Sequence, residues 1–251
     1  MQIGKAFSFS FEDKSWVSKF LLAAVISLVP ILSFAWVGYV VELVKNVIDR
    51  KAEPLPEWGD FGKKFMDGLI LTVVYFVYSL PALLVVCLMS GLIFIPATMQ
   101  SGGNVSEDSL NAIATGSGVV YFCLICLVAL YALVLTVLLP GILANFAQKR
   151  TFGSCFELGE VYRTVARHGS SYFMVVLMIL VVGFAVGLVV GVVTGVVGWI
   201  PCVGWIISIV LYMLSVAYTG AVTGHLVGQY GAEVFNPPSE MMSDMSAPMA
   251  Q

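Results

Sequence analysis

The sequence predicts an all-α protein that crosses a membrane several times, and three observations support this prediction. Apolar residues make up 59% of the 251 residues and charged residues only 11%, whereas about 25% of the residues of a soluble domain are charged. Mean hydropathy is +0.97. Four apolar stretches reach the length of about 20 residues that a helix needs to cross the hydrocarbon core.

The four stretches account for most of the chain as a single polytopic helical bundle. They are Leu69–Ile95, Val119–Ala147, Tyr172–Val197 and Trp205–Val227. A fifth stretch, Phe20–Val44, is also long enough but contains Pro30. We therefore expect four or five spans in one integral membrane domain, residues 1–231. Residues 232–251 are polar and are predicted to form a disordered tail.

The placement of basic residues predicts the orientation of the spans. Lysine and arginine gather in residues 45–64 and 149–167, whereas residues 96–118 and 197–204 contain neither. Loops rich in lysine and arginine face the cytoplasm, so the first two loops are predicted to be cytoplasmic and the other two external. No cleavable signal peptide is visible. The predicted location is the cytoplasmic (inner) membrane of a bacterium or archaeon, as a multi-pass protein.

Two topologies remain open for Phe20–Val44. The N-terminal segment and the loop after this stretch are both basic, so a single crossing would place one of them on the wrong side. Pro30 ends a helix, and about 10 helical residues reach only about 15 Å, half the hydrocarbon core. We favour a re-entrant hairpin, which gives four spans. The alternative is one kinked span, which gives five.

Glycines four residues apart form two stripes in the last two apolar stretches. The first stripe is Gly183, Gly187, Gly191 and Gly195, and the second is Gly220, Gly224 and Gly228. Such a stripe follows one face of a helix and lets another backbone approach closely within lipid. The short connection 197–204 favours the two stripes packing on each other within one chain. Packing between chains is the alternative.

Two segments outside the spans have the character of amphipathic helices that lie on the membrane surface. They are Gly4–Lys19 and Phe152–Gly169, which combine aromatic or aliphatic residues with charged ones. Lipid headgroups are their predicted partner. The side chains that we expect at the headgroups are Trp58, Arg163, Arg167 and His168.

The four spans contain few ionisable groups, which disfavours proton- or ion-coupled transport. Apart from tyrosine and cysteine, His225 is the only ionisable residue between the ends of these stretches. Coupled transporters usually carry buried charges at mid-depth. We assign His225 a structural role. We also expect Glu42 to pair with Lys45, three residues later on the same helix.

No motif in the sequence predicts catalysis or a bound cofactor. The chain contains no nucleotide-binding loop, no HExxH pair and no nucleophilic serine motif. Cys123 and Cys126 have the spacing of metal ligands, but no second pair accompanies them, and we expect both thiols to be buried. The predictions are that the protein is not an enzyme, and that it has no cofactor, no metal site and no nucleic-acid partner.

Several segments resemble one family of integral membrane proteins. They are FSFEDKSWVSKFLLAAVISLVPIL, VGYVVELVKNVIDRKAEPLPEWGDFGKKFMDGL, YSLP and AVTGHLVGQYG. Together they resemble the bacterial and archaeal family called domain of unknown function 4013, over roughly Ala6–Gly231. Leu55–Trp58 with Asp67 and Gly68 is the most specific block. The resemblance implies a polytopic helical membrane protein and supplies neither an activity nor functional residues.

These observations favour a non-enzymatic membrane component: a scaffold, an assembly factor or an accessory subunit. It would act through its glycine-striped helices in a larger membrane complex or a homo-oligomer. The alternative is an uncoupled channel or permease for a small solute, lined by helices that Pro30, Pro81 and Pro140 interrupt. A weaker third hypothesis is a lipid-binding protein that uses Lys149, Arg163 and Arg167.

Overall fold

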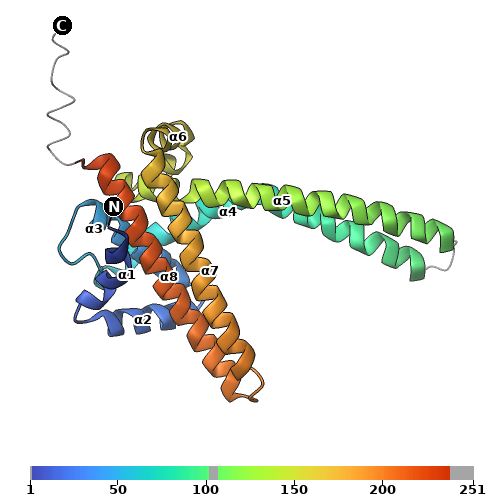
Figure 1. Ribbon diagram of the computed structural model, residues 1–251, viewed down its shortest axis with the longest axis horizontal. Helices are drawn as coiled ribbons and strands as arrows, with labels where there is room; N and C mark the ends of the chain where they lie inside the picture. The colour runs from blue at the N-terminus through green and yellow to red at the C-terminus, as the bar shows by residue number, and fades with distance from the viewer. Residues whose placement is uncertain (1, 102–106, 238–251) are drawn as a thin grey trace, which may run out of the picture. The chain divides into compact units, whose positions relative to one another are not determined.

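The computed structural model describes residues 2–101 and 107–237, and over these residues the chain is all-α (Figure 1). A short 3-10 helix, η1 (Phe152–Phe156), precedes α6. The α-helices are α1 (Ile3–Glu12), α2 (Trp16–Leu28), α3 (Ser33–Ile48), α4 (Phe61–Ser101), α5 (Glu107–Lys149), α6 (Leu158–Arg167), α7 (Gly169–Val197) and α8 (Val203–Phe235).

Four of the described helices are long and apolar enough to cross a membrane, which confirms the predicted multi-pass class. The candidate spans are Phe61–Gly91, Gly118–Lys149, Gly169–Val197 and Val203–Phe235. The helices α4 and α5 are longer than predicted, because both continue into residues 96–118, which we expected to form a polar loop. Pro81 and Pro96 lie within α4 and Pro140 lies within α5, so the expectation that Pro81 and Pro140 interrupt their helices is wrong.

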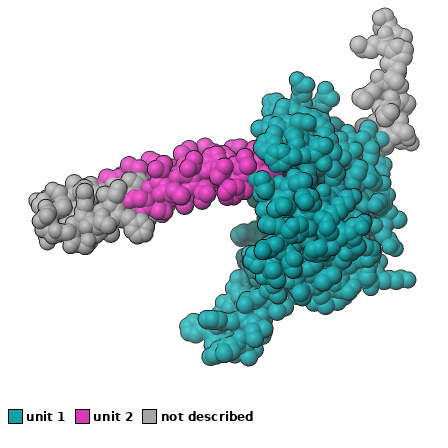
Figure 2. All heavy atoms as spheres, turned by 180° about the vertical axis from the view of Figure 1, so that it is seen from behind, with its two compact units in different colours: residues 1–73, 140–251 teal, residues 74–139 magenta. Residues whose placement is uncertain are grey.

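The chain divides into two compact units, which Figure 2 distinguishes by colour. Unit 2, residues 74–139, contains the distal parts of α4 and α5, where Tyr131 Oη donates a hydrogen bond of 2.6 Å to Tyr78 O. Unit 1 contains the remaining helices, including α8, which continues to Phe235 and so passes the predicted start of the tail. The predicted disorder of that tail falls on residues 238–251, which lie outside the described residues.

The segment Phe20–Val44 forms a hairpin, as we favoured, and not one continuous span. Residues 29–32 separate α2 from α3. Lys19 Nζ, at the start of α2, lies 3.4 Å from Leu55 O, and Asn46 Nδ2, near the end of α3, lies 3.0 Å from Pro54 O. Both ends of the helix pair therefore reach the same short loop. A crossing of the hydrocarbon core would separate them by about 30 Å.

Helix α3 packs against the second glycine stripe, which lies on α8. An added Cβ on Gly220 would lie 2.8 Å from the Trp36 ring. One on Gly224 would lie 3.1 Å from Leu43, and one on Gly228 would lie 2.5 Å from Val47. The residue numbers rise together on both helices, so α3 runs parallel to the C-terminal half of α8. Helix α3 therefore begins beside the middle of α8.

The expectation that the two stripes pack on each other is wrong. The helices α7 and α8 do lie side by side (Figure 1). However, α3 occupies the α8 stripe, and an added Cβ on any glycine of the α7 stripe would meet no heavy atom within 4 Å. The short connection places the two helices together but does not determine which face of each turns toward the other. The α7 stripe, Gly183 to Gly195, is open within unit 1.

The hairpin also crosses α4 with the two backbones in direct contact. An added Cβ on Gly38 would lie 1.7 Å from Lys64 O, and one on Gly68 would lie 1.8 Å from Phe34 O. No side chain fits at either position, because real Cβ atoms do not approach within 3.0 Å of another heavy atom. The Gly68 of the sequence block that carries the family resemblance is thus the residue that lets α4 meet α3.

We predict that Gly68→Ala destabilises the protein by about 3 kcal/mol, because the new methyl group forces the α3–α4 crossing apart. The matched control is Gly62→Ala on the same helix, where an added Cβ meets no heavy atom within 4 Å. Thermal unfolding in mild detergent measures both. Equal melting temperatures for Gly68→Ala and the control would show that the crossing is not as close as described.

Candidate functional site: the polar network at the basic end of unit 1

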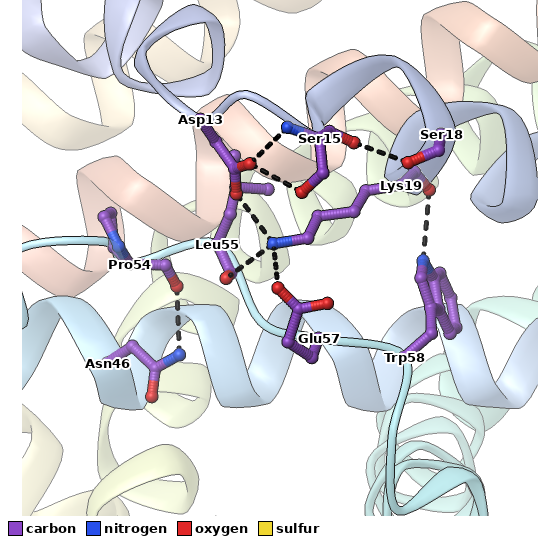
Figure 3. A network of polar contacts seen from close by, with 9 residues as sticks. All are labelled: Asp13, Ser15, Ser18, Lys19, Asn46, Pro54, Leu55, Glu57 and Trp58. Atoms are coloured by element: carbon purple, nitrogen blue, oxygen red, sulfur yellow. Dashed lines mark hydrogen bonds and ion pairs between the residues drawn. The ribbon is translucent and has the colours of Figure 1, made fainter.

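A cluster of charged side chains around a buried lysine lies where the ends of the hairpin meet the loop after α3. Lys19 is the centre of this cluster (Figure 3). Its Nζ lies 2.7 Å from Asp13 Oδ2 and 2.7 Å from Glu57 Oε1, and its side chain is only 6% exposed. A buried ammonium requires such partners, because an unpaired charge would be strongly unfavourable in a low-dielectric surrounding. We call the end of unit 1 that contains Lys19, Arg50 and Arg150 the basic end.

Asp13 links α1 to α2 through the same cluster. Its Oδ1 accepts hydrogen bonds of 2.7 Å from both the backbone N–H and the hydroxyl of Ser15. Burial by itself raises the pKa of the Asp13 carboxyl, but hydrogen bonds from Lys19 and Ser15 outweigh burial and lower that pKa below 3.8. Asp13 is therefore ionised at neutral pH, and its charge balances that of Lys19.

Trp58, in the loop after α3, also belongs to this network. Its Nε1 donates a hydrogen bond of 3.1 Å to Lys19 O, and its ring stacks on Tyr39 with 4.7 Å between ring centroids. We predicted Trp58 as an anchor at the lipid headgroups. The structure gives it a partner in α2 and another in α3, so that it fastens the loop to the hairpin; contact with lipid stays a prediction.

A second buried lysine joins the hairpin to α4. Lys64 Nζ lies 2.8 Å from Glu42 Oε2, and its side chain is 3% exposed. The predicted pair between Glu42 and Lys45 is wrong, because Lys45 instead lies 2.8 Å from Asp49 Oδ1. Sequence spacing identifies neighbours along one helix. The close α3–α4 crossing brings Lys64 to Glu42 from another helix.

A further ion pair joins α4 to the end of α5. The guanidinium of Arg150 contacts the carboxylate of Asp67 within unit 1. Asp67 and Gly68 are neighbours in the block that carries the family resemblance. Asp67 binds Arg150, and Gly68 allows the close approach of α3. Leu55, Trp58, Asp67 and Gly68 all act at this end of unit 1, although they are spread over 14 positions of the chain.

The predicted headgroup residues of the second surface helix lie on or beside α6. Arg163 and Arg167, one turn apart, are exposed, and His168 follows the helix with intermediate exposure. On the opposite side, Val161 is buried against Gly141 of α5. The amphipathic helix is thus present, over Leu158–Arg167 and preceded by η1. Contact of its arginines with headgroups stays a prediction.

His225 has the contacts of a structural residue. It is 4% exposed, and its ring stacks on Phe9 of α1 with 4.2 Å between ring centroids. Its Nδ1 lies 3.1 Å from Nε2 of Gln229, whose amide also exchanges two hydrogen bonds with the backbone of Gln2. Sequence reasoning missed Phe9 and Gln2 as partners, because more than 200 residues separate them from α8.

The thiols of Cys123 and Cys126 are exposed, whereas we expected them to be buried. Both belong to unit 2, whose described residues come from α4 and α5. Across residues 2–101 and 107–237, no group of three or more histidine, cysteine, aspartate or glutamate side chains could hold a metal ion. The ion pairs of Lys19, Lys64 and Arg150 join helices and loops of unit 1, and this arrangement is that of a structural network.

The fold and this network define a multi-pass helical membrane protein whose first hairpin is fastened to the spans by close packing and ion pairs. The chain belongs to the family described as Protein of unknown function (DUF4013), which matches residues 21–195. This match is shorter than the region from Ala6 to Gly231 that we expected. Neither the curated proteins nor the solved structures contain a chain that matches it.

The lowered pKa of Asp13 predicts how acid affects stability. A carboxyl whose folded pKa lies below its unfolded pKa stabilises the fold above the unfolded value, and this contribution disappears as pH falls through the folded value. We expect wild type to lose this contribution below about pH 4. Asp13→Asn should be less stable at neutral pH and lose less stability on acidification, as measured by thermal unfolding at successive pH values.

The control for this measurement is Glu53→Gln, which changes an exposed carboxylate in the loop after α3. Its acid dependence should equal that of wild type. If Asp13→Asn and wild type showed the same acid dependence, Asp13 would contribute nothing to the fold as an ionised partner of Lys19.

Proposed function

We propose that the protein is a non-enzymatic membrane component, a scaffold, assembly factor or accessory subunit, whose α7 face binds a transmembrane helix of another protein. The observation that supports this most strongly is the difference between the two stripes. The α8 stripe is filled by α3, whereas the α7 stripe meets no heavy atom within 4 Å of its added Cβ positions.

The filled stripe indicates what this chain uses such a surface for. At Gly220, Gly224 and Gly228, the missing side chains make room for large side chains of a helix that runs alongside. Within lipid, this tight van der Waals contact is what holds helices together, because burial from water no longer contributes. A helix of matched shape gains such contact along Gly183–Gly195 as well.

The chemistry of α7 restricts the partner. Gly169–Val197 contains no charged residue, so the partner helix should present an apolar face with side chains that enter the stripe. The gathering of basic residues at one end supports the cytoplasmic membrane of a bacterium or archaeon as the location, with that end in the cytoplasm. Lipid headgroups are then the proposed partners of Arg163 and Arg167 on the same side.

The alternative, an uncoupled channel or permease, needs helices that enclose a path. In the most apolar parts of α7 and α8, only 17% of the residues are buried inside the chain. Two helices with so little burial do not enclose a conduit. Accessory binding through an open face needs no such enclosure, and we prefer it for this reason.

The test compares two stripe variants with a matched variant on the same helix. Gly187→Leu and Gly191→Leu fill the stripe, whereas Val189→Leu changes an exposed residue on the opposite face, which is 59% exposed. We expect wild type and Val189→Leu, extracted into lipid nanodiscs at native expression levels, to retain a stoichiometric unlike membrane protein in intact-complex mass spectrometry. Both stripe variants should lose it at least tenfold, about 1.4 kcal/mol.

The folding control is the melting temperature of each chain alone. It should be unchanged in the stripe variants, since their added Cβ atoms meet open space. A complex that persists in both stripe variants would contradict the proposal. A chain without any unlike partner would also contradict it, and solute flux through liposomes that contain only this protein would then favour the channel.

A further inference from the structure

A cavity of about 360 Å³ opens at the basic end of unit 1. It lies between α1, the start of the loop after α3, and the C-terminal part of α8. Small-molecule sites have volumes of about 300–1,000 Å³, so this cavity can hold a small metabolite or a lipid headgroup. It is separate from the ion-pair cluster around Lys19 and from the glycine stripe of α7.

Three cations line the cavity without a carboxylate partner among the described residues. They are Lys5 of α1 and the neighbours Arg50 and Lys51 after α3. Arg50 Nη2 donates a hydrogen bond of 2.7 Å to the backbone carbonyl of Asn236, and Lys51 Nζ donates one of 2.7 Å to Asn46 Oδ1. Both acceptors are neutral, so they orient the cations and leave their charges uncompensated.

The uncompensated cations distinguish this cavity from the rest of the basic end. Lys19, Lys45 and Lys64 each lie within 2.8 Å of a carboxylate oxygen. Like charges gathered in a concave surface repel one another and attract an anion. Phosphate, which accepts several hydrogen bonds at once, is the anion best suited to an arginine and two lysines.

The carboxylate of Glu12 also lines the cavity. It would repel a ligand that carries only negative charge, and it suits a ligand that also carries an ammonium group. The combination of three cations with this carboxylate therefore matches a zwitterion with a phosphate ester and an amine.

Contacts between α1 and α8 hold the walls of the cavity in place. Reciprocal hydrogen bonds of 2.8 and 2.9 Å between Gln2 and Gln229 hold the start of α1 against α8. The stacked rings of Phe9 and His225 hold the middle of α1. A site whose walls are fixed in advance loses less conformational entropy when a ligand binds.

We propose that this cavity binds an aminoalkyl phosphate ester, with the phosphate at Lys5, Arg50 and Lys51 and the amine at Glu12. Two sources supply this chemistry: the phosphoethanolamine headgroup of a membrane lipid, and soluble phosphoethanolamine. The proposal does not depend on the partner of the α7 stripe, because the two surfaces share no residue.

The test uses the full chain in nanodiscs of phosphatidylcholine and phosphatidylglycerol. Soluble phosphoethanolamine, inorganic phosphate and ethanolamine are titrated separately by calorimetry. In parallel, nanodiscs that contain phosphatidylethanolamine are analysed by intact-complex mass spectrometry for retained lipid. Calorimetric binding of phosphoethanolamine assigns the soluble source, and selective retention of phosphatidylethanolamine without calorimetric binding assigns the lipid source. Either result supports the proposal.

The variants locate the binding. Lys51→Gln should weaken binding or retention at least tenfold, and the matched control Lys63→Gln, an exposed lysine outside the cavity, should leave it unchanged. Glu12→Gln should weaken phosphoethanolamine more than inorganic phosphate. Unliganded melting temperatures establish that each variant folds.

Three results would overturn the proposal. The first is the absence of both calorimetric binding and selective lipid retention. The second is equal weakening by Lys51→Gln and Lys63→Gln, which would indicate attraction to the basic surface in general. The third is tighter binding of inorganic phosphate than of phosphoethanolamine in wild type, because the Glu12 carboxylate would then contribute nothing to binding of the amine.

Discussion

Close contact between helix backbones is the constraint on which the structure of unit 1 depends. The hairpin of α2 and α3 lies against α4 where Gly38 and Gly68 face each other's helices, and against α8 along Gly220, Gly224 and Gly228. In lipid, such contacts replace the hydrophobic effect as the source of packing energy. Small residues at these five positions therefore determine where the hairpin can lie.

The polar network depends on the same packing. Because α3 and α4 cross so closely, Lys64 reaches Glu42. Because the hairpin returns to its starting side, Lys19 reaches Glu57 and the loop carbonyl of Leu55 in addition to its sequence neighbour Asp13. Each buried cation then has a carboxylate beside it, which offsets the loss of hydration. The resulting fixed end of the protein forms the walls of the cavity that contains the uncompensated cations.

Sequence reasoning found the features that local patterns encode. Apolar length identified the four spans, and Pro30 together with the charge distribution favoured the hairpin over a fifth span. Spacing of four identified the glycine faces. It could not identify the helix that lies on each face, because the rotation of a helix about its axis is set by neighbours distant in sequence. For the same reason α3, and not α7, fills the α8 stripe.

The polar site was less accessible from sequence than the fold. Trp58 was selected for its aromatic character, and its hydrogen bond to Lys19 O could not be foreseen without the return of the hairpin. Gly38 and Gly68 are isolated glycines, which local patterns do not distinguish from Gly62, where a side chain fits. Spacing along the helix predicted Lys45 as the partner of Glu42, whereas the observed partner is Lys64 of α4.

The most direct test of this arrangement asks whether both ends of the hairpin lie on one side of the membrane. Lys14→Cys precedes α2 and Glu53→Cys follows α3, each in a chain whose five native cysteines are replaced by serine. A membrane-impermeant maleimide is applied to sealed vesicles of each orientation. The hairpin predicts that both positions react in the same vesicles, those with the cytoplasmic face outside. Labelling of the two positions in vesicles of opposite orientation would show a span in place of the hairpin.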